Sequence, residues 1–134
     1  MPSHQGNCLC KAVKYDISGD IKKVVNCHCN LCRSMNGSAF SSYAVVLTDE
    51  FQITSGKTKS FSITEQSKKY FCEQCGTPIF NRNPKYAELT MVYLGTLTEE
   101  NMPKPDVNIY CESELNWSSD LGGIPKFKQG LTRD

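Results

Sequence analysis

The spacing of its cysteines constrains this chain more than any other feature of the sequence. The eight cysteines form three short-range sets and one isolated position: Cys8-Leu9-Cys10, Cys27-His28-Cys29-Asn30-Leu31-Cys32, Cys72-Glu73-Gln74-Cys75, and Cys111. Disulfides rarely join cysteines two or three residues apart without strain, whereas short-range pairs are typical ligands of tetrahedral zinc. The spacing therefore predicts a zinc-thiolate protein rather than a disulfide scaffold.

The sequence shows neither a secretory signal nor a membrane-spanning segment that would direct these thiols to an oxidising compartment. The longest apolar stretch, Ala44-Val45-Val46-Leu47, is far shorter than the roughly 20 residues of a transmembrane helix. The segment from Met1 to Asn7 is polar and lacks the apolar core of a secretory signal. A cytoplasmic protein is therefore expected, and reducing cytosol favours metal-bound or catalytic cysteines.

The length of the chain limits the number of domains, and its net charge limits the classes of partner that it is expected to bind. A chain of 134 residues is long enough for one domain and short for two, so a single domain over residues 1–134 is expected. The net charge is +1, without a long run of either sign, which offers no attraction to nucleic acid or to an anionic membrane. Neither is expected as a partner, and the oligomeric state stays open, a homo-oligomer included.

Short alternating segments predict a mainly β fold with the metal sites on turns. No stretch keeps a helical period for three turns. We expect one helical turn from Arg33 to Gly37, closed by the glycine, and a loop over residues 103–105. The expected strands are residues 12–17, 24–29, 40–47, 51–54, 60–63, 69–71, 78–81, 89–94 and 107–111.

The first and third cysteine sets predict a closed structural site. If Cys8 and Cys10 lie in a strand, their side chains share one face and Leu9 points toward the packed side. Cys72 and Cys75, followed by glycine, are typical of a zinc knuckle, in which backbone N–H groups reach the sulfurs and the glycine can take a positive φ. Four thiolates complete a tetrahedral site and leave no position for a substrate.

The middle set predicts a different kind of site. Cys27, Cys29 and Cys32 offer three ligands within six residues, which is typical of zinc with an open fourth position. His28 should point away from them in an extended segment, in a hydrogen-bonding or surface role, with a fourth ligand or a base as the alternative. Cys111 could instead complete a second closed site with four cysteines.

An open site with three sulfur ligands favours a sulfur substrate. Three thiolates donate much charge to the metal, which makes it a poorer activator of water than a three-histidine site. A thiol that coordinates the metal is deprotonated outright, although a free cysteine thiol has a pKa of about 8.5. The predicted chemistry is the addition of a small thiol to an electrophilic carbon, or the reverse cleavage.

The ordered motifs resemble the glutathione-dependent formaldehyde-activating enzyme family, also called the CENP-V/GFA domain. The matching residues are Gly6 to Cys10, Cys27 to Arg33 with Gly37 and Phe40, Phe71 to Phe80, Asn108-Ile109-Tyr110, Glu112-Ser113, Trp117, and Ile124 to Phe127. The resemblance implies a single-domain Mss4-like fold of short antiparallel strands with two zinc ions per chain. It implies a structural zinc on Cys8, Cys10, Cys72 and Cys75, and a catalytic zinc on Cys27, Cys29 and Cys32.

The resemblance also implies carbon–sulfur lyase activity. The implied reaction is the reversible condensation of glutathione with formaldehyde to S-(hydroxymethyl)glutathione. Because glutathione is anionic, Arg33 is a candidate for binding a substrate carboxylate, with Ser34 and Lys69 as further candidates. A solvated surface position is the alternative for Arg33.

Several residues differ from the family pattern at positions other than those of the predicted ligands. Lys11 stands where the family usually has glycine, Cys111 where an apolar residue is commoner, and Leu115-Asn116 where alanine-proline is commoner.

Two other functions remain open. One is a non-catalytic zinc module that binds a protein partner. The other is a thiol redox enzyme using Cys111, because residues 110–113 faintly resemble methionine sulfoxide reductases of the B type.

Overall fold

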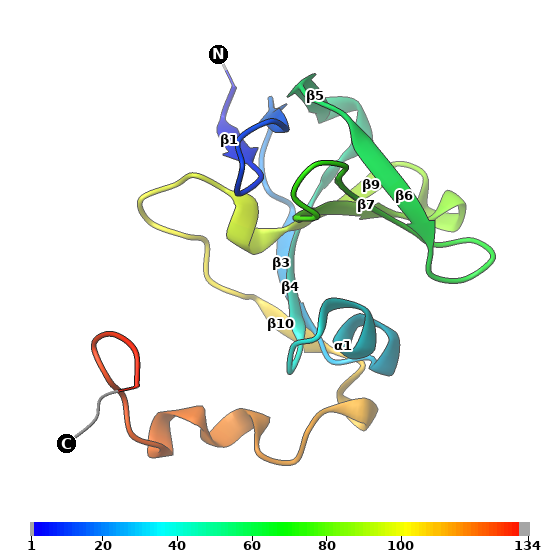
Figure 1. Cartoon of the computed structure of the whole chain (residues 1–134). Helices are drawn as coiled ribbons and strands as arrows, with labels where there is room; N and C mark the ends of the chain where they lie inside the picture. Colours follow the sequence, from blue (N-terminus) through cyan, green and yellow to red (C-terminus); the bar gives the residue numbers. More distant parts are fainter. Residues whose placement is uncertain (1, 132–134) are drawn as a thin grey trace.

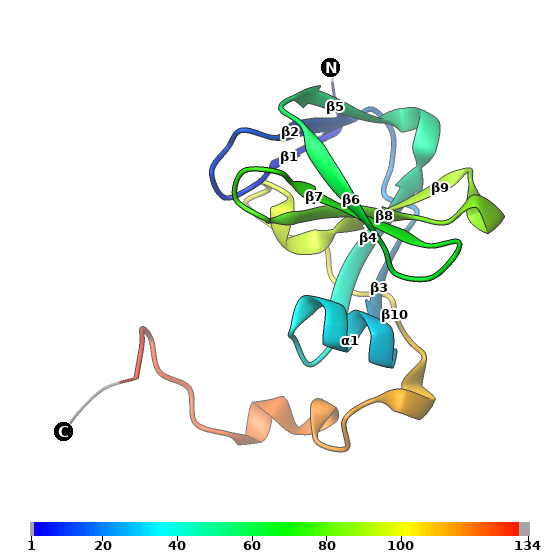
Figure 2. The ribbon, with the colours of Figure 1, turned by 45° about the vertical axis from the view of Figure 1, so that its right-hand side comes forward.

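The computed structural model describes residues 2–131, so Met1 and residues 132–134 of the predicted domain lie outside the described part. Its strands form a smaller sheet in the order β1-β2-β5 and a larger sheet in the order β10-β3-β4-β9-β8-β7-β6 (Figures 1 and 2). The strands are β1 (His4–Asn7), β2 (Lys14–Ile17), β3 (Lys23–Cys27), β4 (Ser41–Leu47), β5 (Phe51–Ser55), β6 (Thr58–Ser62), β7 (Lys68–Cys72), β8 (Pro78–Arg82), β9 (Leu89–Tyr93) and β10 (Val107–Ile109). The mainly β prediction is confirmed.

Strand direction follows the expected antiparallel pattern with one difference. The pairs from β1 to β9 are antiparallel. β10, however, runs parallel to β3, with Val107 opposite Val25. A parallel pair needs a long crossover, and here most of the chain lies between the two strands. β10 thereby brings the residues after it to the end of β3, where Cys27 lies.

Helical structure is sparse among the described residues. The helix α1 (Asn30–Asn36) is longer than the expected turn and ends, as expected, at Gly37, which has a φ of 62°. The 3-10 helices are η1 (Thr48–Glu50), η2 (Pro84–Tyr86), η3 (Leu94–Thr96), η4 (Cys111–Ser113) and η5 (Ser118–Gly123). The expected loop at residues 103–105 is irregular, as predicted.

The central strand β4 separates two hydrophobic cores. Ala44 and Val46 belong to a larger core, whereas Tyr43 and Val45 belong to a smaller one. This division follows from the alternation of side chains along a strand. The larger core contains buried cysteines of the first predicted site, and the smaller one contains a buried cysteine of the second. Each predicted site therefore borders its own core.

The segment after β10 lies outside both sheets. It passes below α1 and away from the sheets (Figures 1 and 2). Large apolar side chains remain exposed along it, namely Trp117, Leu121, Ile124, Phe127 and Leu131. Within residues 2–131, no helix combines the length and apolar character that crossing a membrane requires.

Candidate metal centres

The four cysteines of the predicted structural site lie together. The Sγ atoms of Cys8, Cys10, Cys72 and Cys75 are all within 4.8 Å of one another. The Sγ atom of Cys10 is 3.5 Å from that of Cys8 and 3.8 Å from that of Cys72. Sulfurs bound tetrahedrally at a zinc–sulfur distance of about 2.3 Å would be roughly 3.8 Å apart, whereas a disulfide would bring them to about 2.0 Å. The sulfur spacing therefore fits a metal ion and not a disulfide.

The turn from Cys72 to Cys75 has the hydrogen bonds expected of a knuckle. The backbone N–H groups of Gln74 and Cys75 donate to the Sγ atom of Cys72 at 3.3 and 3.4 Å. Gly76 has a φ of 79°, in the left-handed region that glycine adopts without strain. The knuckle geometry expected from the sequence is therefore present.

Cys75 is held in a setting that favours its thiolate. The Thr77 hydroxyl lies 3.1 Å from the Sγ atom of Cys75. This contact and a hydrogen bond from the backbone of Cys10 lower the pKa of Cys75 from 9.0 to about 5. Because the thiolate is the form of cysteine that binds metal, this exposed side chain is prepared to act as a ligand.

The segment from Cys8 to Lys11 is a turn, so the expected strand alternation is wrong here. The backbone N–H of Lys11 donates to the Cys8 carbonyl at 3.0 Å. Leu9 is 86% exposed instead of packed, because it lies at the outer side of this turn. Lys11 has a φ of 67°, a left-handed conformation that favours glycine. This explains physically why glycine is usual at that position in the family that the sequence resembles.

The structure also brings together the three cysteines of the middle set. The Sγ atoms of Cys27, Cys29 and Cys32 lie within 4.8 Å of one another. Cys27 ends β3, and Cys29 is the N-cap of α1, where its Sγ atom accepts a hydrogen bond from the Cys32 backbone N–H at 3.2 Å. The cap and the first helical turn thus place these thiols side by side. Their role as zinc ligands stays a prediction.

The contact between Cys27 and Cys32 shifts the pKa values of the two thiols in opposite directions. The contact with Cys32 lowers the pKa of Cys27, whereas the same contact, together with burial, raises the pKa of Cys32. The contact therefore favours one thiolate and one thiol in this pair.

A chain of polar side chains on the larger sheet supports Cys32. The Tyr43 hydroxyl donates to the Sγ atom of Cys32 at 3.2 Å, Asn81 Nδ2 donates to the Tyr43 oxygen at 3.2 Å, and the Tyr93 hydroxyl donates to Asn81 Oδ1 at 2.9 Å. Burial raises the pKa of Tyr43, so its hydroxyl keeps the proton that it donates. Such partners orient a ligand and reduce the charge on its sulfur. The sequence-based interpretation missed these residues.

A cavity of about 510 Å³ opens onto the middle cluster. All three cysteines of the cluster line it, together with Tyr43, Asn81, Arg82, Tyr86, Met91 and Tyr110. Its volume is within the range of small-molecule sites. The middle cluster can therefore meet a small ligand from this cavity.

His28 and Cys111 lie outside the cluster. His28 is 3% exposed, and its Nε2 atom is 2.9 Å from Asn108 Oδ1. The expected hydrogen-bonding role is therefore present, but the expected surface position is not. Cys111 is exposed and is not among the thiols that gather in either cluster of the described residues. The alternative in which Cys111 closes the second site therefore lacks its fourth ligand in this structure.

The Arg33 side chain is occupied by contacts within the chain. Its Nη1 atom donates to the Ser113 carbonyl at 2.9 Å, and its Nη2 atom donates to Asn30 Oδ1 at 2.7 Å. Arg33 is not among the residues that line the cavity at the cysteines, whereas Ser34 and Lys69 line a neighbouring cavity. The contacts of Arg33 join α1 to η4.

Two interpretations of Arg33 differ in what they expect of Arg33→Ala. The sequence-based one expects weaker thiol binding, whereas the observed contacts predict a free energy of unfolding lower by about 1 kcal/mol with unchanged thiol affinity. We expect the second result. Urea unfolding and calorimetric thiol titration of both proteins would measure it. A tenfold loss of affinity at unchanged stability would instead place the guanidinium at the substrate.

Comparisons with known proteins agree with these features. A family model described as glutathione-dependent formaldehyde-activating enzyme matches residues 3–113. The chain is 33% identical over 82 residues to an uncharacterized lyase of Schizosaccharomyces pombe, an alignment that covers 60% of this chain and 58% of the relative. It is 27% identical over 78 residues to a putative glutathione-dependent formaldehyde-activating enzyme of Emericella nidulans, covering 57% and 40%. The chain thus spans about half the length of these curated relatives.

The fold is similar to that of a solved structure. The crystal structure of a Rhodobacter sphaeroides protein superposes with a TM-score of 0.60 over 72% of this chain and 90% of that chain, at 20% sequence identity.

Proposed function

The chain belongs to the glutathione-dependent formaldehyde-activating enzyme family, and from this membership we propose that it is a zinc-dependent carbon–sulfur lyase. The proposed reaction is the reversible addition of a small thiol, with glutathione as the first candidate, to formaldehyde or a related electrophile. The product from glutathione and formaldehyde is S-(hydroxymethyl)glutathione. The observation that carries the proposal is the cluster of three cysteines on the wall of a cavity.

The two thiol clusters have different tasks in this proposal. Residues 1–134 form one zinc domain, in which the four-cysteine cluster holds a structural ion and the three-cysteine cluster holds a catalytic ion. The ligands are Cys8, Cys10, Cys72 and Cys75 for the first ion, and Cys27, Cys29 and Cys32 for the second. A catalytic zinc, when bound, supplies a Lewis acid that favours the thiolate form of a substrate thiol.

The residues around the cavity hold the reacting groups in place. The hydrogen bond from the Tyr43 hydroxyl fixes the position of the Cys32 sulfur. In the addition, the substrate sulfur bonds to the carbonyl carbon while the C=O electron pair moves to oxygen, which takes up a proton. Cleavage follows the same path in reverse.

The test is a titration of glutathione into the zinc-loaded protein in weak buffer near neutral pH. About one proton should be released per thiol bound, because a thiol with a pKa of about 8.5 arrives protonated and binds as a thiolate. S-methylglutathione, which has no thiol, is the matched control and should release none. Addition of formaldehyde should then form S-(hydroxymethyl)glutathione faster than in the protein-free mixture, as followed by NMR. Equal responses to both ligands would contradict the proposal.

A further inference from the structure

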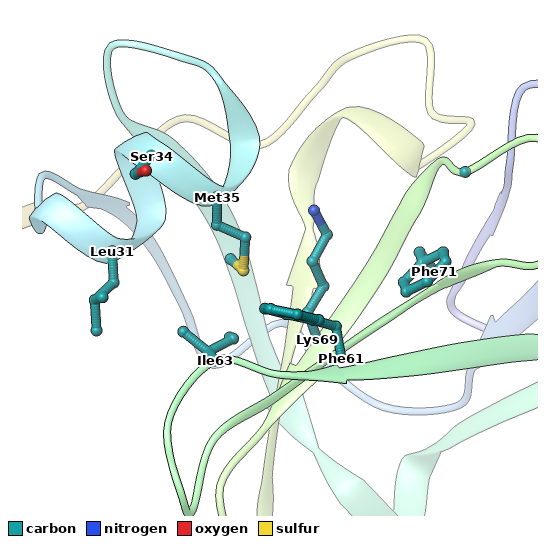
Figure 3. A pocket seen from close by; sticks show the side chains of 8 residues that line it. Leu31, Ser34, Met35, Phe61, Ile63, Lys69 and Phe71 are labelled. Atoms are coloured by element: carbon teal, nitrogen blue, oxygen red, sulfur yellow. The ribbon is translucent and has the colours of Figure 1, made fainter.

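A second cavity lies beside the one at the cysteines. It has a volume of about 600 Å³ and lies between α1 and the hairpin of β6 and β7 (Figure 3). Its walls are mostly apolar, with side chains from Leu31 and Met35 of α1 and from Phe61, Ile63 and Phe71. A cavity of this size and apolar character is suited to part of a small organic molecule.

Lys69 is the charged residue among those that line this cavity. Its side chain is partly buried, and its Nζ atom donates to the neutral Asn36 Oδ1 at 3.0 Å. Among the described residues, no carboxylate lies within salt-bridge distance of this ammonium. Figure 3 shows the lysine chain extending among the apolar side chains. A partly desolvated charge with only a neutral partner favours an anionic ligand, which would supply the missing countercharge.

The two cavities adjoin each other. Leu31 and Ile63 line both of them. The Nζ atom of Lys69 lies 6.0 Å from the centre of the Tyr93 ring, whose centre is 4.9 Å from that of Tyr43. The Tyr43 hydroxyl in turn contacts Cys32 at 3.2 Å. This series of contacts connects the ammonium with the cysteine cluster through one aromatic pair.

We propose that the Lys69 cavity binds the carboxylate of the thiol substrate. The thiol lies at Cys27, Cys29 and Cys32, an apolar arm crosses Leu31 and Ile63, and the carboxylate pairs with the Lys69 ammonium. Among small thiols, this subsite therefore favours those that carry a carboxylate over neutral thiols of the same length. This inference rests on the proposed function, because it assigns the second half of the same substrate site.

The test compares two thiols of similar length, one with a charged end group and one with a neutral end group. Mercaptohexanoate and mercaptohexanol have the same apolar arm and end in a carboxylate and a hydroxyl, respectively. Each is titrated into protein loaded with cobalt in place of zinc, and binding is read from the sulfur-to-cobalt charge-transfer band. The carboxylate thiol should bind roughly 10- to 100-fold more tightly, as expected for a hydrogen bond between charged groups.

Variants of Lys69 locate the origin of that preference. Lys69→Gln should remove the difference between the two thiols, and Lys69→Arg should retain most of it because the charge remains. Lys68→Gln is the matched control, since Lys68 is the preceding residue of β7, points to the opposite face and is exposed. Metal content and thermal unfolding of each variant verify that the fold is intact.

The outcomes separate this inference from the proposed function. If both thiols bind equally, or if Lys69→Gln keeps the preference, the Lys69 subsite is refuted while thiol binding at the cysteines stands. If neither thiol nor glutathione changes the charge-transfer band, the proposed function fails first and the subsite fails with it. Loss of the preference in Lys68→Gln as well would assign it to overall charge and also refute the subsite.

Discussion

Cys75→Ser should release one of the two proposed zinc ions per chain and lower the free energy of unfolding by about 3 to 5 kcal/mol. A structural zinc contributes its binding free energy to folding, and losses of this size are exceptional for a single substitution. Cys75 is exposed, so the change from sulfur to oxygen leaves no cavity in the core. The loss would therefore report the metal and not packing. Metal analysis together with chemical unfolding would measure both effects.

Cys111→Ser is the matched control for this prediction. Cys111 is also exposed but belongs to neither cluster, so its substitution should change the free energy of unfolding by no more than about 0.5 kcal/mol. If Cys75→Ser retained both zinc ions and unfolded like the unmodified protein, the structural site would be refuted.

Cys29→Ser should abolish the response to glutathione and reduce lyase activity by more than about 100-fold, because even partners outside the ligand set commonly change activity or metal affinity by 10- to 100-fold. Its effect on the fold should be small. The Sγ atom of Cys29 accepts the capping hydrogen bond of α1, and serine is among the best N-cap residues. The helix can therefore begin at the same place without the sulfur ligand.

The readout for Cys29→Ser combines three measurements. Metal analysis should give one zinc ion per chain, calorimetry should give no glutathione binding, and the melting temperature should stay within a few degrees. Cys111→Ser should keep both ions and full activity. Normal glutathione binding by Cys29→Ser would show that the thiol is bound elsewhere and would contradict the catalytic assignment.

The local pattern of apolar and polar residues was sufficient to predict the position of most strands. Each expected strand overlaps an observed strand, with ends that agree to within about two residues. The strand β1 was missed because its sequence, His4 to Asn7, is polar, and it forms by pairing with β2. The strand expected over residues 107–111 ends at Ile109, because Tyr110 adopts a left-handed conformation with a φ of 56°. Neither feature has a local signal in the sequence.

Of the candidate site, only the cysteine clusters were predictable from the sequence. The spacing within each cysteine set is local and could be recognised from the sequence, and the pairing of the first set with the third followed from the four thiolates that complete a tetrahedral site. The support of Cys32 instead depends on strand register, since Tyr43 on β4 lies opposite Tyr93 on β9. That register is fixed by tertiary packing. The Lys69 cavity depends in the same way on how the hairpin of β6 and β7 is placed relative to α1, which no short segment specifies.

The two clusters enclose very different lengths of chain. Cys10 and Cys72 are 62 positions apart, whereas Cys27 and Cys32 belong to one short segment. Closing the long loop in the unfolded chain has an entropic free-energy cost of about 4 kcal/mol, whereas closing the short one costs about 2 kcal/mol. During synthesis the short segment is complete long before Cys75 has emerged. Of the two proposed zinc ions, the one at the three-cysteine cluster is therefore expected to bind first, and the later ion would close the long loop.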